Sequence, residues 1–247
     1  MKYITSTFTV LAILLISPHI ARAQGSATPP DSPWSFSVNF GMDNPVSGNL
    51  IDGGIGTLNS MSVVIDPSSY GDVYGNGVQW RFNVGYMLKP DSEVLGSLLY
   101  GVASGEPLQI GTATAPLFGD FSDHQQLGIE GGYRKYLTAH GHWRPYVGGT
   151  MGLMFVDRIQ ANFTVPDVGT VQTSANLYDN TTAFTFSAHG GVLYEINPRF
   201  GIGGELGLRW RGGLSEIDDL QGSGLEKIND NSDSWTLPFG ITARFRF

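Results

Sequence analysis

The final segment of the chain, Ser234-Trp-Thr-Leu-Pro-Phe-Gly-Ile-Thr-Ala-Arg-Phe-Arg-Phe247, decides how the whole sequence is interpreted. Apolar residues occupy alternate positions, and polar or small residues lie between them. The apolar positions are Trp235, Leu237, Phe239, Ile241, Phe245 and Phe247, and those between include Thr236, Thr242, Arg244 and Arg246. Successive side chains of a β-strand point to opposite faces, so this alternation predicts a strand with one apolar face. A tilted strand crosses a membrane in about 9–11 residues, and this segment is long enough.

Seven earlier segments repeat the alternation. In the clearest of them, Val78, Trp80 and Phe82 alternate with Gln79 and Arg81. With the last segment included, the predicted strands are 33–42, 77–88, 93–104, 125–137, 143–156, 182–196, 199–211 and 234–247.

The connections between these strands alternate strictly between short and long. The short ones are 89–92, 138–142 and 197–198, and the long ones are 43–75, 105–124, 157–181 and 212–233. Short periplasmic turns at one rim and longer extracellular loops at the other are typical of transmembrane barrels. We therefore predict an all-β fold, an up-and-down antiparallel barrel of eight transmembrane strands with short periplasmic turns and long extracellular loops.

A soluble barrel with its apolar face inward, such as a lipocalin, would show the same alternation. Two features argue against it. The second face is largely Gly, Ser and Thr with isolated charges, which suits the narrow interior of an eight-stranded barrel better than a surface in water. Aromatic residues also lie near the strand ends of the apolar face, where membrane interfaces favour them. They are Trp34, Trp80, Tyr86, Tyr133, Tyr194, Trp210, Trp235 and Phe247.

The N-terminus has the pattern of a secretory signal peptide. Lys2 is basic, residues 10–16 (VLAILLI) are apolar, and Ala21 and Ala23 form an A-x-A cleavage site. A transmembrane anchor is the alternative, but the apolar stretch is too short to cross about 30 Å of hydrocarbon. We expect a signal peptide over 1–23 with cleavage after Ala23, a short periplasmic lead-in over 24–32 and a barrel domain over 33–247.

The composition limits the available chemistry. The 247 residues include no cysteine, which excludes thiol catalysis and cysteine-based metal sites. Removal of residues 1–23 takes away Lys2 and Arg22 and no acidic residue, which leaves 12 basic residues, 22 acidic residues and a net charge of −10. This acidic balance argues against a nucleic-acid partner.

Three segments resemble the family of eight-stranded outer-membrane β-barrel proteins that includes OmpA-like and opacity-type surface proteins. They are Leu127-Gly-Ile-Glu-Gly-Gly-Tyr-Arg134, Arg144-Pro-Tyr-Val-Gly-Gly149 and Ile241-Thr-Ala-Arg-Phe-Arg-Phe247. The last is similar to the C-terminal signal that the outer-membrane assembly machinery reads, and its apolar residues here are Phe239, Ile241, Phe245 and Phe247. The resemblance implies a barrel in the outer membrane of a Gram-negative bacterium, in contact with outer-membrane lipid and lipopolysaccharide. It is specific for architecture and weak for function.

Five charged residues fall on the small-residue face of the predicted strands, and therefore inside the barrel. They are Arg81, Glu130, Arg134, Glu205 and Arg209. Charges removed from water must be paired. Two interpretations remain: a structural salt-bridge plug, or a gate controlling a small pore, as the resemblance to OmpA-like barrels implies.

The four long connections hold 16 acidic residues and only two basic ones, Arg158 and Lys227. Such a surface could attract cations or a basic partner, and divalent ions could bridge it to lipopolysaccharide. It could equally be a solvated, repulsive surface that prevents aggregation.

Other polar patterns predict little chemistry. Residues 229–233 (NDNSD) offer oxygen ligands but lack the Gly and the distal Glu of a calcium loop. Ser187 and His189 share one face of a strand, and Glu205 could be near, but the lipid A deacylases among small barrels place His before Ser and on the lipid side. We predict no catalytic residue, no cofactor and no metal site.

The sequence therefore favours a non-enzymatic outer-membrane barrel with a structural or surface-interaction role through acidic extracellular loops. A narrow or gated porin-like channel for small solutes or ions is the alternative. A lipid-modifying enzyme is a remote third possibility.

Overall fold

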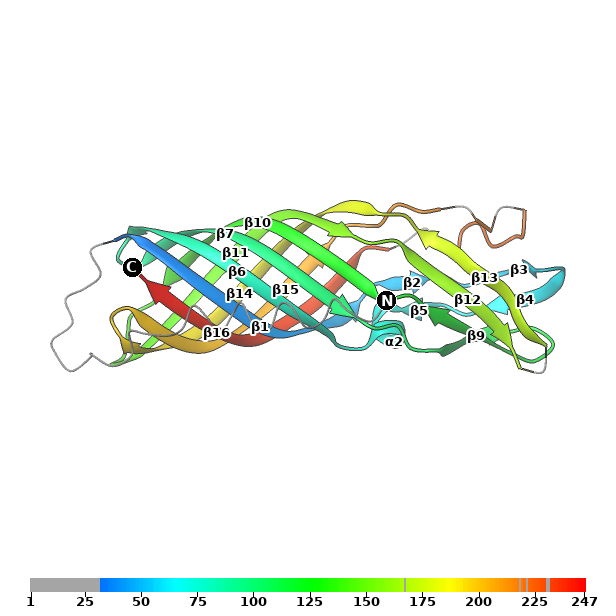
Figure 1. Ribbon diagram of the computed structural model, residues 1–247, viewed down its shortest axis with the longest axis horizontal. Coiled ribbons are helices and arrows are strands. Elements are labelled where there is room, and N and C mark those ends of the chain that lie inside the picture. Colours follow the sequence, from blue (N-terminus) through cyan, green and yellow to red (C-terminus); the bar gives the residue numbers. More distant parts are fainter. Residues whose placement is uncertain (1–31, 167, 218, 221, 230–231) are drawn as a thin grey trace, which may run out of the picture.

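The computed structural model describes residues 32–166, 168–217, 219–220, 222–229 and 232–247. Eight antiparallel strands close into a barrel in the order β1-β16-β15-β14-β11-β10-β7-β6 (Figure 1). Their bounds are β1 Trp34–Ser47, β6 Gly77–Lys89, β7 Ser92–Ala103, β10 His124–Tyr136, β11 Trp143–Val156, β14 Thr181–Asn197, β15 Phe200–Arg211 and β16 Ser234–Arg246. The predicted fold class is confirmed, and each barrel strand lies where the alternation predicts it.

The barrel has an apolar exterior and a polar interior. Ile241 is 69% exposed and Met151 is 62% exposed, whereas Arg209 is only 2% exposed. A soluble protein shows the reverse distribution. The outer surface therefore matches the apolar band that transmembrane barrels present to lipid, and the lipocalin-like alternative is wrong.

Aromatic residues lie outside the barrel near both ends of its strands. Near the short turns, the rings of Trp34 and Tyr86 lie 5.0 Å apart between centroids. Toward the other rim, Phe40 contacts Trp80 at 4.4 Å and Phe186 contacts Trp235 at 5.7 Å. Amphipathic rings are favoured at the two membrane interfaces, so these pairs form the predicted girdles.

The long connections are not irregular loops. They contain β2 Asn49–Ile51, β3 Gly54–Leu58, β4 Met61–Ile65, β5 Ser68–Ser69, helix α2 Tyr70–Tyr74, β8 Leu108–Thr112, β9 Pro116–Phe121, β12 Ile159–Val165 and β13 Gly169–Tyr178. Six of these strands form one sheet in the order β13-β12-β9-β8-β4-β3, and β2 pairs with β5. We call these elements, with the described residues of 212–229, the head. Figure 1 shows the head continuing the long axis of the barrel beyond one rim.

The head has its own apolar core. Leu50, Ile110, Leu117 and Phe163 have no exposed surface, and Ile65 is 2% exposed. The burial pattern of β12 alternates strictly, which is the signature of a strand with one face against a core. The sequence analysis missed these strands because most are only two to seven residues long, and alternation over so few positions is a weak signal.

Described residues of 212–229 bond to both edge strands of the head sheet or to the residue that follows them. On the β3 side, Thr57 N donates to Ser223 O at 2.7 Å. On the β13 side, Ile217 N donates to Leu177 O at 3.2 Å and Asp179 N donates to Ser215 O at 2.9 Å. Exposed sheet edges are templates for aggregation, and these bonds occupy part of each edge.

The predicted signal peptide over 1–23, its cleavage residues Ala21 and Ala23, and nearly all of the lead-in over 24–32 lie outside the described residues. Among the residues that the structure describes, no helix is long and apolar enough to cross a membrane.

Loss of packing in the core of the head should destabilise the head without unfolding the barrel. Phe163→Ala deletes a fully buried ring, and we expect a cost of about 3–5 kcal/mol to the head. Limited proteolysis of the folded protein in detergent should then cut within 43–75 or 157–181 faster than in the wild type. Unheated and boiled samples should still migrate differently in a detergent gel, as an intact barrel does. Ile55→Ala, at a side chain 72% exposed, is the control. Loss of the unheated band in Phe163→Ala would contradict the separation of head and barrel.

Candidate functional site

The interior of the barrel is the main candidate site, because the charged residues of the strands lie at positions whose side chains point inward. All five predicted cluster residues are present in the lumen. Arg81, Glu130 and Arg134 are each 3% exposed, Arg209 is 2% exposed, and the side chain of Glu205 is 7% exposed. The structure therefore places these five residues among the buried charges of the barrel.

Glu205 joins two of the arginines. Its Oε1 lies 2.8 Å from Arg81 Nη1, and its Oε2 lies 3.5 Å from Arg134 Nη2. The hydroxyl of Tyr146 donates to Oε2 at 2.8 Å. Both oxygens of this buried carboxylate are thus neutralised and hydrogen-bonded, as burial requires.

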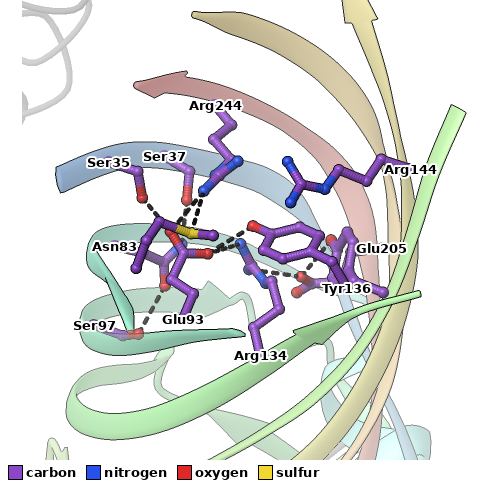
Figure 2. A network of polar contacts seen from close by, with 12 residues as sticks. Ser35, Ser37, Asn83, Glu93, Ser97, Arg134, Tyr136, Arg144, Glu205 and Arg244 are labelled. Carbon is purple, nitrogen blue, oxygen red and sulfur yellow. Dashed lines mark hydrogen bonds and ion pairs between the residues drawn. The ribbon is translucent and has the colours of Figure 1, made fainter. Parts of the chain in front are cut away.

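Glu93 is the centre of the network toward the short turns. Figure 2 shows its carboxylate between Arg244 and Arg134. Oε1 lies 2.8 Å from Arg244 Nη2, and Oε2 lies 3.6 Å from Arg134 Nη1. The hydroxyls of Tyr136, at 2.6 Å, and Ser35 also donate to it. Arg134 thereby links Glu93 to Glu205 in one continuous chain of charges.

Arg209 organises a second group nearer the head. Its Nη1 lies 3.4 Å from Asp43 Oδ2 and donates to Gln79 Oε1 at 2.8 Å. Its Nε lies 3.8 Å from Glu130 Oε1. Thr150 donates to the other oxygen of Glu130 at 2.9 Å. The two groups together contain four arginines and four carboxylates, so the network has no net formal charge.

The sequence analysis missed three members of this network. Asp43 falls in the predicted long connection 43–75, and Glu93 and Arg244 are not included in the predicted cluster. Asp43 belongs to the lumen because β1 continues to Ser47, five residues beyond the predicted end. Glu93 and Arg244 could have been predicted from the alternation, because each lies an even number of residues from a small polar residue of the inward face. Those residues are Ser97 and Thr242.

Two small cavities lie at the two ends of the network. A cavity of about 40 Å³ lies at the head end, and one of about 10 Å³ lies among Glu195, Arg199 and Arg244 near the short turns. A cavity needs about 10–15 Å³ to hold one water. These two cavities therefore have room for only a few waters.

The Ser187–His189 pair lacks the geometry of a nucleophile and its base. Both residues face the lumen, but Ser187 Oγ bonds Thr150 Oγ1 at 2.7 Å. Neither ring nitrogen of His189 has a hydrogen-bond partner within the described part of the chain. Acyl transfer requires the base to bond the nucleophile, so this arrangement does not support it.

The acidic segment 229–233 is partly described, since residues 230 and 231 lie outside the described residues. The Asn229 amide donates to Leu177 O at 2.6 Å, and Asp233 accepts from Trp210 Nε1 at 3.2 Å. Both side chains are therefore used within the protein. Within 32–247, excluding the undescribed positions, no group of three or more His, Asp or Glu side chains could hold a metal ion.

Comparisons with known proteins describe the fold only. No family model matches the chain, and no curated protein sequence matches it. Among solved structures, Neisserial surface protein A is similar, with 12% identity, a TM-score of 0.48, and coverage of 87% of this chain and 98% of the other. The attachment invasion locus protein Ail of Yersinia pestis has 14% identity and a TM-score of 0.40, over 87% and 99%. The outer membrane protease OmpT of Escherichia coli has 7% identity and a TM-score of 0.40, over 91% and 99%.

Breaking the network at Glu93 should destabilise the barrel. Glu93→Gln leaves Arg244 and Arg134 without that carboxylate, and loss of one partner of a buried ion pair costs about 3–5 kcal/mol. Denaturant unfolding in lipid vesicles, followed by tryptophan fluorescence, measures the change. Asp91→Asn breaks the exposed pair with Lys135 and should have little effect. Equal effects of the two variants would show that the lumen network does not stabilise the barrel.

Proposed function

We propose that this protein is a non-enzymatic outer-membrane barrel that acts through its acidic head, while its lumen is closed by the ion-pair network. One observation carries the proposal above the others: the four long connections fold into a single cored unit at one rim of a barrel whose interior is filled. The working surface is then the head rather than the lumen.

The filled lumen favours a structural plug rather than an open pore. Arg81, Arg134 and Glu205 are tied together across the interior, and their charges are balanced within it. Such a network resists the entry of ions, because displacing one partner would leave the other buried and uncompensated. The narrow or gated channel remains the alternative function.

The exterior of the head supports an interaction with positive charge. Its acidic side chains Asp66, Asp120, Glu216 and Asp219 are exposed, and the long connections hold only two basic residues. Clustered charge of one sign steers oppositely charged partners to a surface. We propose a basic partner, with divalent cations bridging the head to lipopolysaccharide as the second occupant of the same charges.

The outer face of β16 supports assembly into the outer membrane. Phe239, Ile241, Phe245 and Phe247 are 39%, 69%, 41% and 54% exposed on the apolar side. An accessible apolar row ending in phenylalanine suits both contact with lipid and recognition by the assembly machinery. We therefore propose that the protein resides in the bacterial outer membrane after export with a cleaved signal peptide.

Conductance in planar bilayers separates the plug from the channel. We expect the wild-type protein to be silent at all voltages. The double variant Arg81→Ala/Glu205→Ala removes the central pair together with its bulk, and it should conduct. Lys135→Ala/Asp91→Ala, which removes an exposed pair near the short turns, should stay silent.

Regular wild-type steps that change with Arg81→Ala or Glu130→Gln would establish the channel instead. Lipid-modifying activity lost in His189→Ala would establish the enzyme.

Neutralising the head should weaken its binding of basic ligands. The triple variant Asp66→Asn/Asp120→Asn/Glu216→Gln keeps side-chain size and removes three exposed charges. Binding of a labelled lysine-rich peptide to the protein in detergent, measured by fluorescence anisotropy, should fall at low salt. The difference should vanish at high salt, where surface charges are screened. Asp91→Asn, near the opposite rim, is the control. Binding unchanged in the triple variant would exclude the head as the basic-partner surface.

A further inference from the structure

The cavity of about 40 Å³ lies where the head meets the barrel. Figure 1 shows helix α2 at this junction. The walls come from α2 and from the barrel strands β1, β6, β7, β10, β15 and β16. The polar lining residues with unused hydrogen-bonding atoms are Asp43, Tyr74, His124, Arg209, Arg211 and Thr236. Head and barrel thus contribute to the same small space.

The lining holds an unusual concentration of unsatisfied buried atoms. Asp43 Oδ1, Tyr74 Oη, His124 Nδ1, Arg209 Nη2, Arg211 Nε and Thr236 Oγ1 have no hydrogen-bond partner among the described residues. Buried polar atoms are paired in the great majority of native structures, and each exception needs an explanation. Six such atoms around one cavity point to a ligand that is shared among them.

Most of these atoms are hydrogen-bond donors. Arg211 Nη1 lies 3.1 Å from His124 Nε2, and a guanidinium can only donate, so Nε2 accepts. The proton of the neutral imidazole is then on Nδ1, which faces no partner in the described structure. Burial raises the pKa of Tyr74, so its hydroxyl also stays protonated. Asp43 Oδ1 is the one atom of the set that can only accept.

The guanidinium of Arg211 is also in no ion pair with a carboxylate of the described residues. The residue is 4% exposed. Its other contacts are Ser232 O at 3.4 Å and the ring of Tyr70, whose centroid lies 4.9 Å from Cζ. Arg209, by contrast, has both Asp43 and Glu130. Water could satisfy the donors around Arg211 but could not neutralise its charge.

We propose that this cavity binds a single small anion of halide size, held by Arg211, His124 and the Tyr74 hydroxyl. The anion neutralises the buried guanidinium and satisfies donors from α2, β10 and β15 at once. It thereby ties the head to the mouth of the barrel. The volume suits one small ion, with Arg209 and Thr236 adding donors at the wall.

Bromide is the probe that tests the site, because it scatters anomalously and resembles chloride in size. Crystals of the full folded protein grown in sodium bromide should show an anomalous peak in the junction cavity. The peak should weaken in Tyr74→Phe, which removes one hydroxyl, and disappear in Arg211→Gln. Arg158→Gln, at an exposed ion pair of the head, should leave it unchanged.

A solution measurement covers the case in which Arg211→Gln fails to fold. In detergent at constant ionic strength, replacing gluconate by bromide should raise the midpoint of head unfolding in the wild type and in Arg158→Gln. Most of that rise should be lost in Tyr74→Phe. The proposal is overturned if the cavity contains only water in bromide crystals, if the peak survives both cavity variants, or if Tyr74→Phe keeps the full bromide effect.

Discussion

Closure of the hydrogen-bond ladder between β1 and β16 is the constraint on which the rest of the structure depends. In lipid every backbone amide must be bonded within the protein, and a sheet achieves this only when it has no edge. Phe40 pairs with Ile241 across the seam and with Trp80 on its other side. The β1–β16 pairing needs glycine at position 41, where the two backbones lie close together, because a Cβ on Gly41 would lie 2.0 Å from Phe239 O.

Closure then determines where the charges go. Once one face of every strand contacts lipid, the opposite face points into a lumen too narrow for bulk water. Arginines and carboxylates at those positions must neutralise each other, and they do so in one network of four arginines and four carboxylates, in which Glu93, Glu205 and Arg209 make the central contacts. In the proposed function the solvent-exposed acidic head at the rim, rather than the filled lumen, is therefore the working surface.

The head follows the same rules as a soluble β-structure. Its apolar side chains, among them Leu50 and Phe163, point inward, and its acidic ones point to solvent. The chain therefore changes its pattern at the rim, from apolar outside to apolar inside. The junction cavity lies at this change, where polar groups of the lumen such as Arg211 meet the first buried residues of the head, such as Tyr74.

The sequence by itself determined the eight barrel strands, their faces and five residues of the lumen network, because alternation over about ten or more residues is a local property that survives in any register. It could not show that Glu93 and Arg244 meet, since that pairing depends on strand stagger around the closed barrel. It also could not show the head. That sheet joins strands from three connections distant in sequence, its short strands form only together, and only the closed barrel brings them to one rim.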